Sequence, residues 1–207
     1  MASTTQATWL VQEVINHYLR EGSHPVIGVL DCSRAFDMAR WDKLFHLLLE
    51  VKKVPPIVVR TLIFMYEEQY AWVRWGDTAK SERFKITNGT RQGSMASPAL
   101  WSVYCDPLLG RLRLLGVGCH VNGLWMSAQM YCDDLIILAP NRRAMVLMLN
   151  EVEKWAAEYG ITFSTDVNVN MSKSKLIYVT GNQPKLPKPA EMLLCGGRCH
   201  GWLRHHI

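Results

Sequence analysis

Residues 130–138 read Met130-Tyr131-Cys132-Asp133-Asp134-Leu135-Ile136-Ile137-Leu138. Two adjacent carboxylates lie between two short apolar runs, a pattern that predicts a β-hairpin with aspartates in its tight turn. Two neighbouring anions repel each other, so a divalent cation would stabilise them at the tip of such a turn. Mg²⁺ prefers oxygen ligands of this kind. Aspartate is also a common turn residue, so a turn without a metal stays open as the alternative at this point.

The composition is that of a folded chain with a mild basic excess. Of its 207 residues 49% are hydrophobic and 20% charged, which argues against wholesale disorder and leaves room for one domain, or a domain with an incomplete neighbour. A net charge of +5 permits a nucleic-acid partner without requiring one. No apolar run approaches the roughly 18 residues of a membrane-spanning helix, so we expect no membrane. The six scattered cysteines and the lack of a secretory signal favour reduced thiols in an intracellular chain, nuclear or cytoplasmic.

Local patterns predict the secondary structure along most of the chain. Helical spacing and capping residues predict these helices: one closed by Gly22, 41–49, one from Pro55-Pro56 through Tyr66, Ser97 to about Leu115, and Asn141 to Gly160. Short apolar runs predict strands at 26–30, 71–75, 83–87, on both sides of Asp133-Asp134, at 161–164 and at 176–179. Asn122-Gly123 predicts a further two-residue hairpin turn. The prolines after Gly181 indicate an irregular connector.

This order of elements favours an α+β fold with helices on one face of a largely antiparallel sheet. Asp31 follows the strand at 26–30, and in such a sheet it can lie beside the turn that contains Asp133 and Asp134. The separation along the chain is 133 − 31 = 102 residues, so only the fold could bring them together. Three carboxylates could then hold two Mg²⁺ ions roughly 4 Å apart, an arrangement that activates a hydroxyl and stabilises a leaving pyrophosphate.

Four motifs in this order resemble those of reverse transcriptases, particularly the enzymes of non-LTR retrotransposons. The motifs are Leu30-Asp31-Cys32-Ser33-Arg34-Ala35-Phe36-Asp37, Arg91-Gln92-Gly93-Ser94-Met95-Ala96-Ser97-Pro98, Tyr131-Cys132-Asp133-Asp134 and Asn170-Met171-Ser172-Lys173-Ser174-Lys175. The likeness covers roughly residues 7 to 180. It implies a polymerase palm with a ferredoxin-like core over residues 26–180. Residues 1–25 would be a leading helix, a remnant of the fingers, and residues 181–207 a poorly structured connector.

The resemblance also implies roles for the acidic residues and for one lysine. Asp31, Asp133 and Asp134 match the catalytic metal carboxylates, which would hold two Mg²⁺ ions, with Mn²⁺ as an alternative. Of the turn pair, Asp134 is the more tolerant position. Lys173 matches a general acid that protonates the departing pyrophosphate, and Lys175 is the alternative assignment for it. Either lysine could instead be an exposed residue beside a strand.

The remaining matches concern the nucleotide and the template. Phe36 matches an aromatic gate that excludes a ribose 2′-hydroxyl by steric clash, although ordinary core packing would also explain a phenylalanine there. Gln92 and Gly93 match the loop that contacts the incoming nucleotide. The template and primer would be contacted by Arg91, Ser97, Pro98 and Tyr131. Arg91 could equally be a solvated surface charge.

Two departures from the family pattern bear on activity. Cys132 stands where alanine or methionine is more usual, and Ser94-Met95-Ala96 replaces a more common acidic and aliphatic filling, but neither change removes a ligand. With about 30 residues before Asp31 and the last residue at Ile207, the resemblance leads us to expect incomplete fingers and no thumb in the printed sequence. The C-terminal cysteines and histidines, Cys195, Cys199, His200, His205 and His206, match no zinc module.

The leading hypothesis is therefore RNA-directed DNA synthesis, with an RNA template, a DNA primer and deoxynucleoside triphosphates as partners. The alternative is a truncated remnant that folds as a palm but does no catalysis and binds nucleic acid weakly at most. A polymerase that makes RNA and a nucleotide cyclase are disfavoured by Phe36, by Gln92-Gly93 and by Ser97-Pro98. The sequence leaves the oligomeric state and the copied RNA open.

Overall fold

The computed structural model describes residues 4–76, 79–91, 93–164 and 174–179. The chain divides into two compact units. We call the described parts of Met1–Ser33 and Pro107–Ile207 the sheet unit, and those of Arg34–Asp106 the insert unit. None of the helices in the described ranges is long and apolar enough to cross a membrane.

A four-stranded sheet with the strand order β10-β1-β9-β8 lies at the centre of the sheet unit. Its strands are β1 (Val26–Asp31), β8 (Ala128–Tyr131), β9 (Asp134–Ala139) and β10 (Lys175–Tyr178). All neighbouring strands in this sheet are antiparallel. With helical segments between β1 and β8 and between β9 and β10, this is the strand order of a ferredoxin-like fold. The predicted mixed fold with an antiparallel sheet is confirmed.

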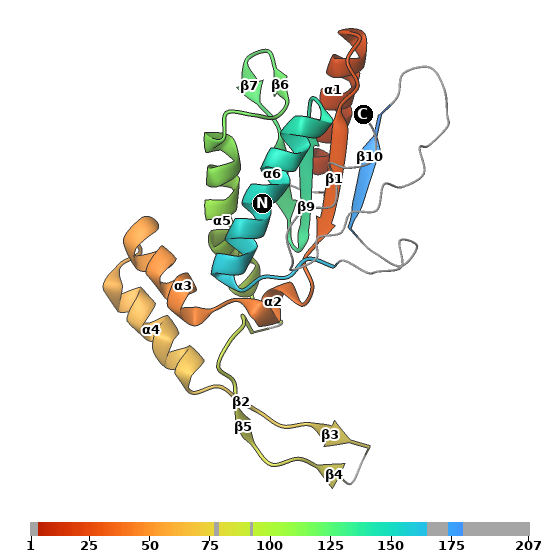
Figure 1. The fold of residues 1–207 in the computed structure, drawn as a ribbon. Coiled ribbons are helices and arrows are strands. Elements are labelled where there is room, and N and C mark those ends of the chain that lie inside the picture. The colour runs from red at the N-terminus through yellow and green to blue at the C-terminus, as the bar shows by residue number, and fades with distance from the viewer. Residues whose placement is uncertain (1–3, 77–78, 92, 165–173, 180–207) are drawn as a thin grey trace. The chain divides into compact units, whose positions relative to one another are not determined.

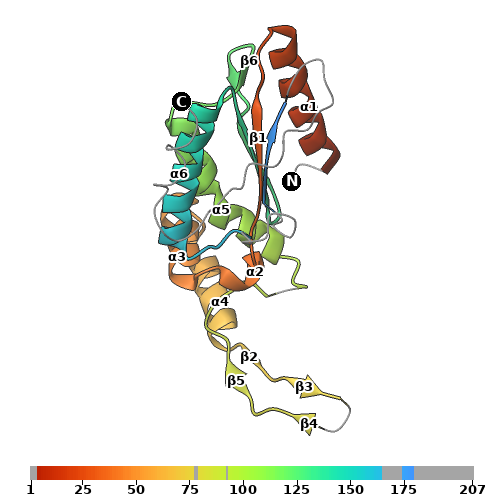
Figure 2. The same ribbon diagram turned by 45° about the vertical axis from the view of Figure 1, so that its right-hand side comes forward.

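Helices α1 (Thr4–Arg20) and α6 (Arg142–Tyr159) cover opposite faces of this sheet (Figures 1 and 2). Val14 of α1 joins a buried cluster with Ile27 of β1. The next residue, Gly28, faces α6, because a Cβ added to it would lie 3.4 Å from the sulfur of Met145. Successive strand residues point to opposite faces, so the two helices must lie on different sides. The prediction that the helices lie on one face is wrong for α1, which packs on the sheet.

Local sequence signals explain the ends of α6 and the small β6–β7 hairpin (His120–Val121 and Leu124–Trp125). Asn141 Oδ1 accepts a hydrogen bond of 2.9 Å from the backbone N–H of Ala144, and Gly160 follows the helix with a φ of 71°. Asn122 and Gly123 both have positive φ, 50° and 78°, as a type I′ turn requires. Both predicted elements are confirmed.

The insert unit consists of short helices followed by a two-part hairpin. Its elements are α2 (Ala35–Met38), α3 (Trp41–His46), the π-helix η1 (Leu47–Val51), α4 (Pro56–Glu67), β2 (Tyr70–Ala71), β3 (Arg74–Trp75), β4 (Ala79–Lys80) and β5 (Phe84–Lys85). Helix α5 (Ser97–Leu114) begins in this unit and continues into the sheet unit at Pro107. Pro107 lacks an N–H donor, so α5 loses a backbone hydrogen bond at this boundary.

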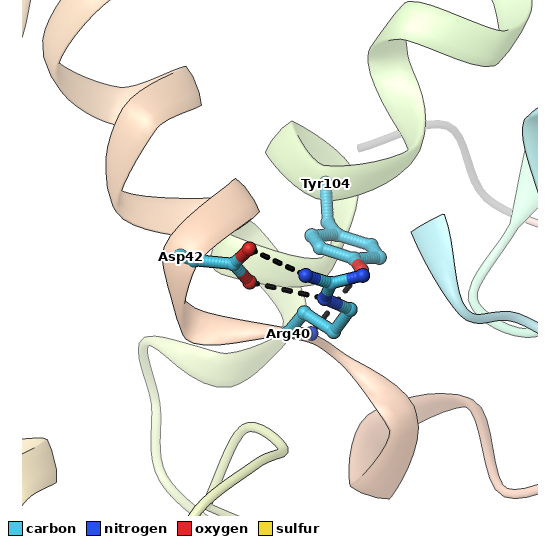
Figure 3. A network of polar contacts seen from close by, with 3 residues as sticks. All are labelled: Arg40, Asp42 and Tyr104. Carbon is cyan, nitrogen blue, oxygen red and sulfur yellow. Dashed lines mark hydrogen bonds and ion pairs between the residues drawn. The ribbon is translucent and has the colours of Figure 1, made fainter. Parts of the chain in front are cut away.

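A polar network fixes the start of α3 within the insert unit (Figure 3). The guanidinium of Arg40 donates two hydrogen bonds to the carboxylate of Asp42, 3.1 Å from Nε and 2.6 Å from Nη2. The backbone N–H of Arg40 donates to the hydroxyl of Tyr104 on α5 at 3.1 Å. Burial raises the pKa of Tyr104 to about 12, so this hydroxyl stays neutral and able to accept.

Two local predictions are wrong in detail. Residues 161–164 form no strand, and only Phe163 makes an isolated bridge, with Cys32. The turn between β8 and β9 has Cys132 and Asp133 as its central residues, because Tyr131 pairs with Asp134. Asp134 is therefore the first residue of β9 and not part of the turn itself.

Candidate active site

The three acidic residues expected to share a site come together at one end of the sheet. Asp31, the last residue of β1, lies directly opposite Asp134 in the antiparallel register. Directly opposed residues point to the same face of a sheet, with Cα atoms about 4.5–5.5 Å apart. The backbone N–H of Cys32 donates to the carbonyl oxygen of Asp133 at 2.9 Å, which joins the turn to the end of β1. The expected adjacency is confirmed for the backbone, while the roles of the three residues stay predictions.

The pKa of the Cys32 thiol shows the electrostatic effect of the three carboxylates. Its side chain is buried, and burial is the main reason that the pKa of its thiol is raised, followed by the negative charges of Asp133, Asp31 and Asp134. All three carboxylates therefore act on the same buried atom. Like charges gathered in this way repel, which favours a cation nearby.

The donor set fits a hard divalent cation in its chemistry. Carboxylate oxygens are the side-chain ligands that Mg²⁺ prefers, and the fold offers three carboxylates, from the end of β1, the start of β9 and the β8–β9 turn. In the part of the chain that the structure describes, however, no three His, Cys, Asp or Glu side chains are gathered as a metal-binding group. The fit therefore rests on the chemistry of the residues and on the strand register.

Serine hydroxyls hold Asp31 from the side opposite to β9. The hydroxyl of Ser164 donates to Oδ2 of Asp31 at 2.6 Å and also lies 2.9 Å from the hydroxyl of Ser33. The backbone N–H of Ser164 donates to the carbonyl oxygen of Asp31 at 2.7 Å. The backbone N–H of Asp31 donates in turn to the hydroxyl of Ser174 at 3.2 Å. Asp31 is thus fixed through both its backbone and its carboxylate.

In the insert unit, Phe36 and the loop after Asn88 lie against each other. The ring of Phe36 is half-buried and tilted against Trp101, with ring centroids 5.8 Å apart. The backbone N–H of Thr90 donates to the carbonyl oxygen of Phe36 at 2.6 Å. A Cβ on Gly89 would lie 2.9 Å from the same oxygen, so the loop approaches α2 as closely as only glycine allows.

The loop before α5 presents an exposed backbone. Gly93 has a φ of 82°, and nothing lies within 4 Å of where a Cβ would be. Arg91 is exposed, and its carbonyl oxygen accepts a 2.5 Å hydrogen bond from the hydroxyl of Ser97. Ser97 is the first residue of α5 and Pro98 follows in its first turn, as predicted, but the hydroxyl of Ser97 holds the preceding loop. Gln92 lies outside the described residues.

The other predicted site residues are distributed as follows. Tyr131 is half-buried at the end of β8, opposite Asp134. Lys175 is exposed at the start of β10 and pairs with Val29. Lys173 and the C-terminal cysteines and histidines lie outside the described residues.

A family model described as "Reverse transcriptase (RNA-dependent DNA polymerase)" matches residues 2–188. The chain belongs to this reverse transcriptase family. The resemblance seen in the four motifs is thereby confirmed. Two curated relatives are retrovirus-related Pol polyproteins, from type-1 retrotransposable element R2 of Nasonia vitripennis and from type-2 retrotransposable element R2DM of Drosophila melanogaster. Each is 26% identical over 76% of this chain. The chain spans only 16% and 15% of their lengths.

Solved structures support the fold assignment. A chain of apo telomerase from Candida tropicalis matches with a TM-score of 0.60 at 13% identity, over 89% of this chain and 36% of that one. Telomerase from Candida albicans, in complex with a fragment of telomeric RNA, matches with a TM-score of 0.54 at 12% identity, over 89% of this chain and 31% of that one. At such low identity the likeness concerns the fold alone.

Sequence reasoning missed Ser164 and Ser174 as neighbours of the reverse transcriptase carboxylates. Ser174 stands in a quoted motif, but its hydroxyl was given no role. Ser164 was placed in a predicted strand, and no local pattern links it to Asp31, which is 133 residues away. Only the tertiary fold shows this hydrogen bond.

Ser164→Ala is expected to lower both stability and any polymerase activity. The variant removes a short hydrogen bond to an ionised carboxylate, so we expect the free energy of unfolding in urea to fall by about 1.5–3 kcal/mol. Primer extension should fall about tenfold if Asp31 must be held in place. Ser102→Ala is the matched control, because Ser102 is exposed and its hydroxyl donates to the carbonyl oxygen of Pro98 in its own helix. Equal stability of the two variants would show that the Ser164 bond does not hold Asp31.

Proposed function

We propose that this chain is the RNA-directed DNA polymerase palm of a retrotransposon protein, which adds deoxynucleotides to the 3′-hydroxyl of a DNA primer on an RNA template. The observation that carries the proposal is the register that pairs Asp31 with Asp134, with Asp133 in the adjoining turn. Membership of the reverse transcriptase family supports the same chemistry. The RNA template would be read by base pairing, with the protein contacting mainly its backbone.

Asp31, Asp133 and Asp134 would provide the oxygen ligands for the metal ions. When bound, two Mg²⁺ ions supply charge neutralisation at the triphosphate and activation of the primer hydroxyl. In the reaction a bond forms between the primer 3′-oxygen and the α-phosphorus, and the bond from that phosphorus to pyrophosphate breaks. Lys173 would donate a proton to the pyrophosphate, with Lys175 as the alternative donor.

The nucleotide would be selected by residues of the insert unit. We assign Phe36 as the residue that excludes a 2′-hydroxyl, which is compatible with its half-buried ring. Gln92 and Gly93 would contact the nucleotide, and the open space around Gly93 is compatible with this role. Arg91, Ser97, Pro98 and Tyr131 would contact the template or primer.

Primer extension by the full 207-residue chain tests the proposal. With a DNA primer on a poly(A) RNA template, Mg²⁺ and dTTP, the wild type should extend the primer and Asp133→Ala should not. Asp106→Asn is the control, because this exposed carboxylate of α5 pairs with Lys52 and lies in the insert unit. When UTP replaces dTTP in the same assay, Phe36→Val should incorporate more nucleotide than the wild type. If the wild type incorporates nothing with either Mg²⁺ or Mn²⁺, the chain is an inactive remnant.

A further inference from the structure

The hairpin over residues 70–85 exposes more aromatic surface than a hairpin normally does. Its two ladder segments pair β2 with β5 and β3 with β4, and Figures 1 and 2 show them as one extended arm. Trp75 is 81% exposed, Trp72 50% and Phe84 50%. An isolated two-stranded hairpin is only marginally stable in water and exposed aromatic rings are unfavourable there. An exposed arm of this composition is typical of a binding surface.

One face of this hairpin combines aromatic rings with cations. Residues at alternate positions point to the same face, and cross-strand partners share it. Tyr70 of β2 pairs with Lys85 and Arg74 of β3 pairs with Lys80, while Trp72 lies in the short stretch between β2 and β3. We call Tyr70, Trp72, Arg74, Lys80, Arg83 and Lys85 the basic-aromatic face.

Two cation–π contacts show that these side chains are neighbours. The ammonium of Lys80 lies 3.8 Å from the centre of the Trp72 ring, and the guanidinium of Arg83 lies 4.0 Å from the centre of the Tyr70 ring. A cation on one side of a ring leaves the other side for a further partner, and Tyr70 is still 37% exposed. The cations are also close enough to the rings to form an ion pair with an anionic group of a ligand that stacks on them.

We propose that the basic-aromatic face binds a single strand of nucleic acid. A nucleic-acid strand has flat bases that stack on aromatic rings and a phosphate at each step that pairs with Lys or Arg. The face offers two rings and four cations, with a cation over each ring. This inference rests on the proposed function, because it adds a second place where the polymerase holds a nucleic-acid strand. Binding at this face requires neither a metal ion nor a nucleotide.

Charge distinguishes this partner from others. Residues 70–85 contain four Lys or Arg and two acidic residues, Asp77 and Glu82, so an acidic partner is favoured. A protein surface that binds lipid has a continuous apolar face with cations at its edge. Here two cations lie directly over the rings of Trp72 and Tyr70. RNA and DNA single strands share the chemistry in question, and the experiment separates them.

Binding of fluorescein-labelled oligonucleotides of about 12 nucleotides to the full chain tests the proposal by anisotropy, in EDTA without nucleotides. We expect U-only RNA and T-only DNA to bind, and Trp72→Ala to raise the Kd by about 5- to 150-fold, the range for loss of one base–aromatic stack. Phe64→Ala is the control, because Phe64 is a 68% exposed aromatic of the same unit on α4 and should raise the Kd less than twofold. Both residues are exposed, so neither variant should unfold.

The salt dependence of the same binding tests the cations separately. Removing one phosphate contact from a single strand lowers the slope of log K against log salt by about 0.7. Lys85→Ala should show this change, while Arg60→Ala, an exposed cation of α4, should leave the slope unchanged.

Three results would overturn the inference. They are no oligonucleotide binding by the wild type, equal effects of Trp72→Ala and Phe64→Ala, and Trp72-dependent binding of phosphatidylserine vesicles but not of oligonucleotides. If the wild type binds through Trp72 but never extends a primer, the polymerase proposal fails and the binding surface stands. If the wild type extends a primer but does not bind oligonucleotides through Trp72, the binding-surface proposal fails and the polymerase proposal stands.

Discussion

Asp31→Asn is expected to lower the rate of primer extension by about 10³-fold while changing the free energy of unfolding by less than about 1 kcal/mol. The loss of rate corresponds to about 4 kcal/mol of transition-state stabilisation, a usual contribution of a metal-bound charge. The small stability change follows from two opposing effects. The carboxylate loses its charged hydrogen bond from Ser164, but its repulsion from the opposed Asp134 also disappears. Single-turnover extension and urea unfolding in EDTA measure the two quantities.

Asp134→Asn separates these two effects. The structure places Asp134 opposite Asp31, so this variant relieves the repulsion and leaves the Ser164–Asp31 bond in place. We expect it to be more stable than the wild type in EDTA by about 0.2–1 kcal/mol. Its rate should fall only about tenfold, because the resemblance to the family implies that Asp134 is the more tolerant position of the aspartate pair. Asp42→Asn is the control, since its carboxylate pairs with Arg40 and its removal should not stabilise the chain.

Adding Mg²⁺ should make the wild type more stable than Asp134→Asn, which reverses their order in EDTA. A cation that binds the folded wild type stabilises it by mass action, and the variants that lack a carboxylate gain less. If Mg²⁺ leaves the unfolding midpoint of the wild type unchanged at millimolar concentration, Asp31, Asp133 and Asp134 do not hold it in this chain.

Elements with strong local signals were predictable from the sequence. The helix over Arg142–Tyr159 begins after a capping asparagine and ends at a glycine with positive φ, and both signals are read from neighbouring residues. The strand Val26–Asp31 is a continuous apolar run, as expected for a strand covered on both faces. That Asp31 lies beside the Asp133–Asp134 segment could be inferred as well, because Asp31 ends one apolar run and the aspartate pair precedes another in a sheet expected to be antiparallel.

What could not be predicted depends on contacts between distant segments. The stretch at residues 161–164 alternates apolar and polar residues as a strand does, but its pairing with the segment after β1 is limited to one bridge, between Cys32 and Phe163. Cys132 takes a left-handed φ of 53° in the turn, where an aspartate was expected, because the register of β8 and β9 decides which residues are central. In both cases tertiary hydrogen bonding outweighs local propensity.

The β6–β7 hairpin is joined to the sheet through Gly118, and this contact predicts the largest effect on stability. Gly118 has a φ of 118°, and a Cβ added there would lie 2.6 Å from Cβ of Ser127 and closer still to its hydroxyl. Ser127 is fully buried and its hydroxyl donates to the carbonyl oxygen of Cys119 at 2.9 Å. Movement of either segment would disturb the backbone hydrogen bonds of Leu138 in β9, whose N–H donates to Ser127 and whose carbonyl oxygen accepts from Cys119.

Gly118→Ala is therefore expected to lower the free energy of unfolding by about 3–4 kcal/mol, the sum of overpacking and of a strained backbone. Urea unfolding followed by tryptophan fluorescence measures it. Gly116→Ala is the matched control, since Gly116 has a φ of 65° and nothing within 4 Å of its added Cβ, and should cost about 1 kcal/mol. In a Ser127→Gly background the penalty of Gly118→Ala should shrink, because the clashing atoms are gone. An unchanged penalty would mean that backbone strain, and not the contact with Ser127, requires a glycine here.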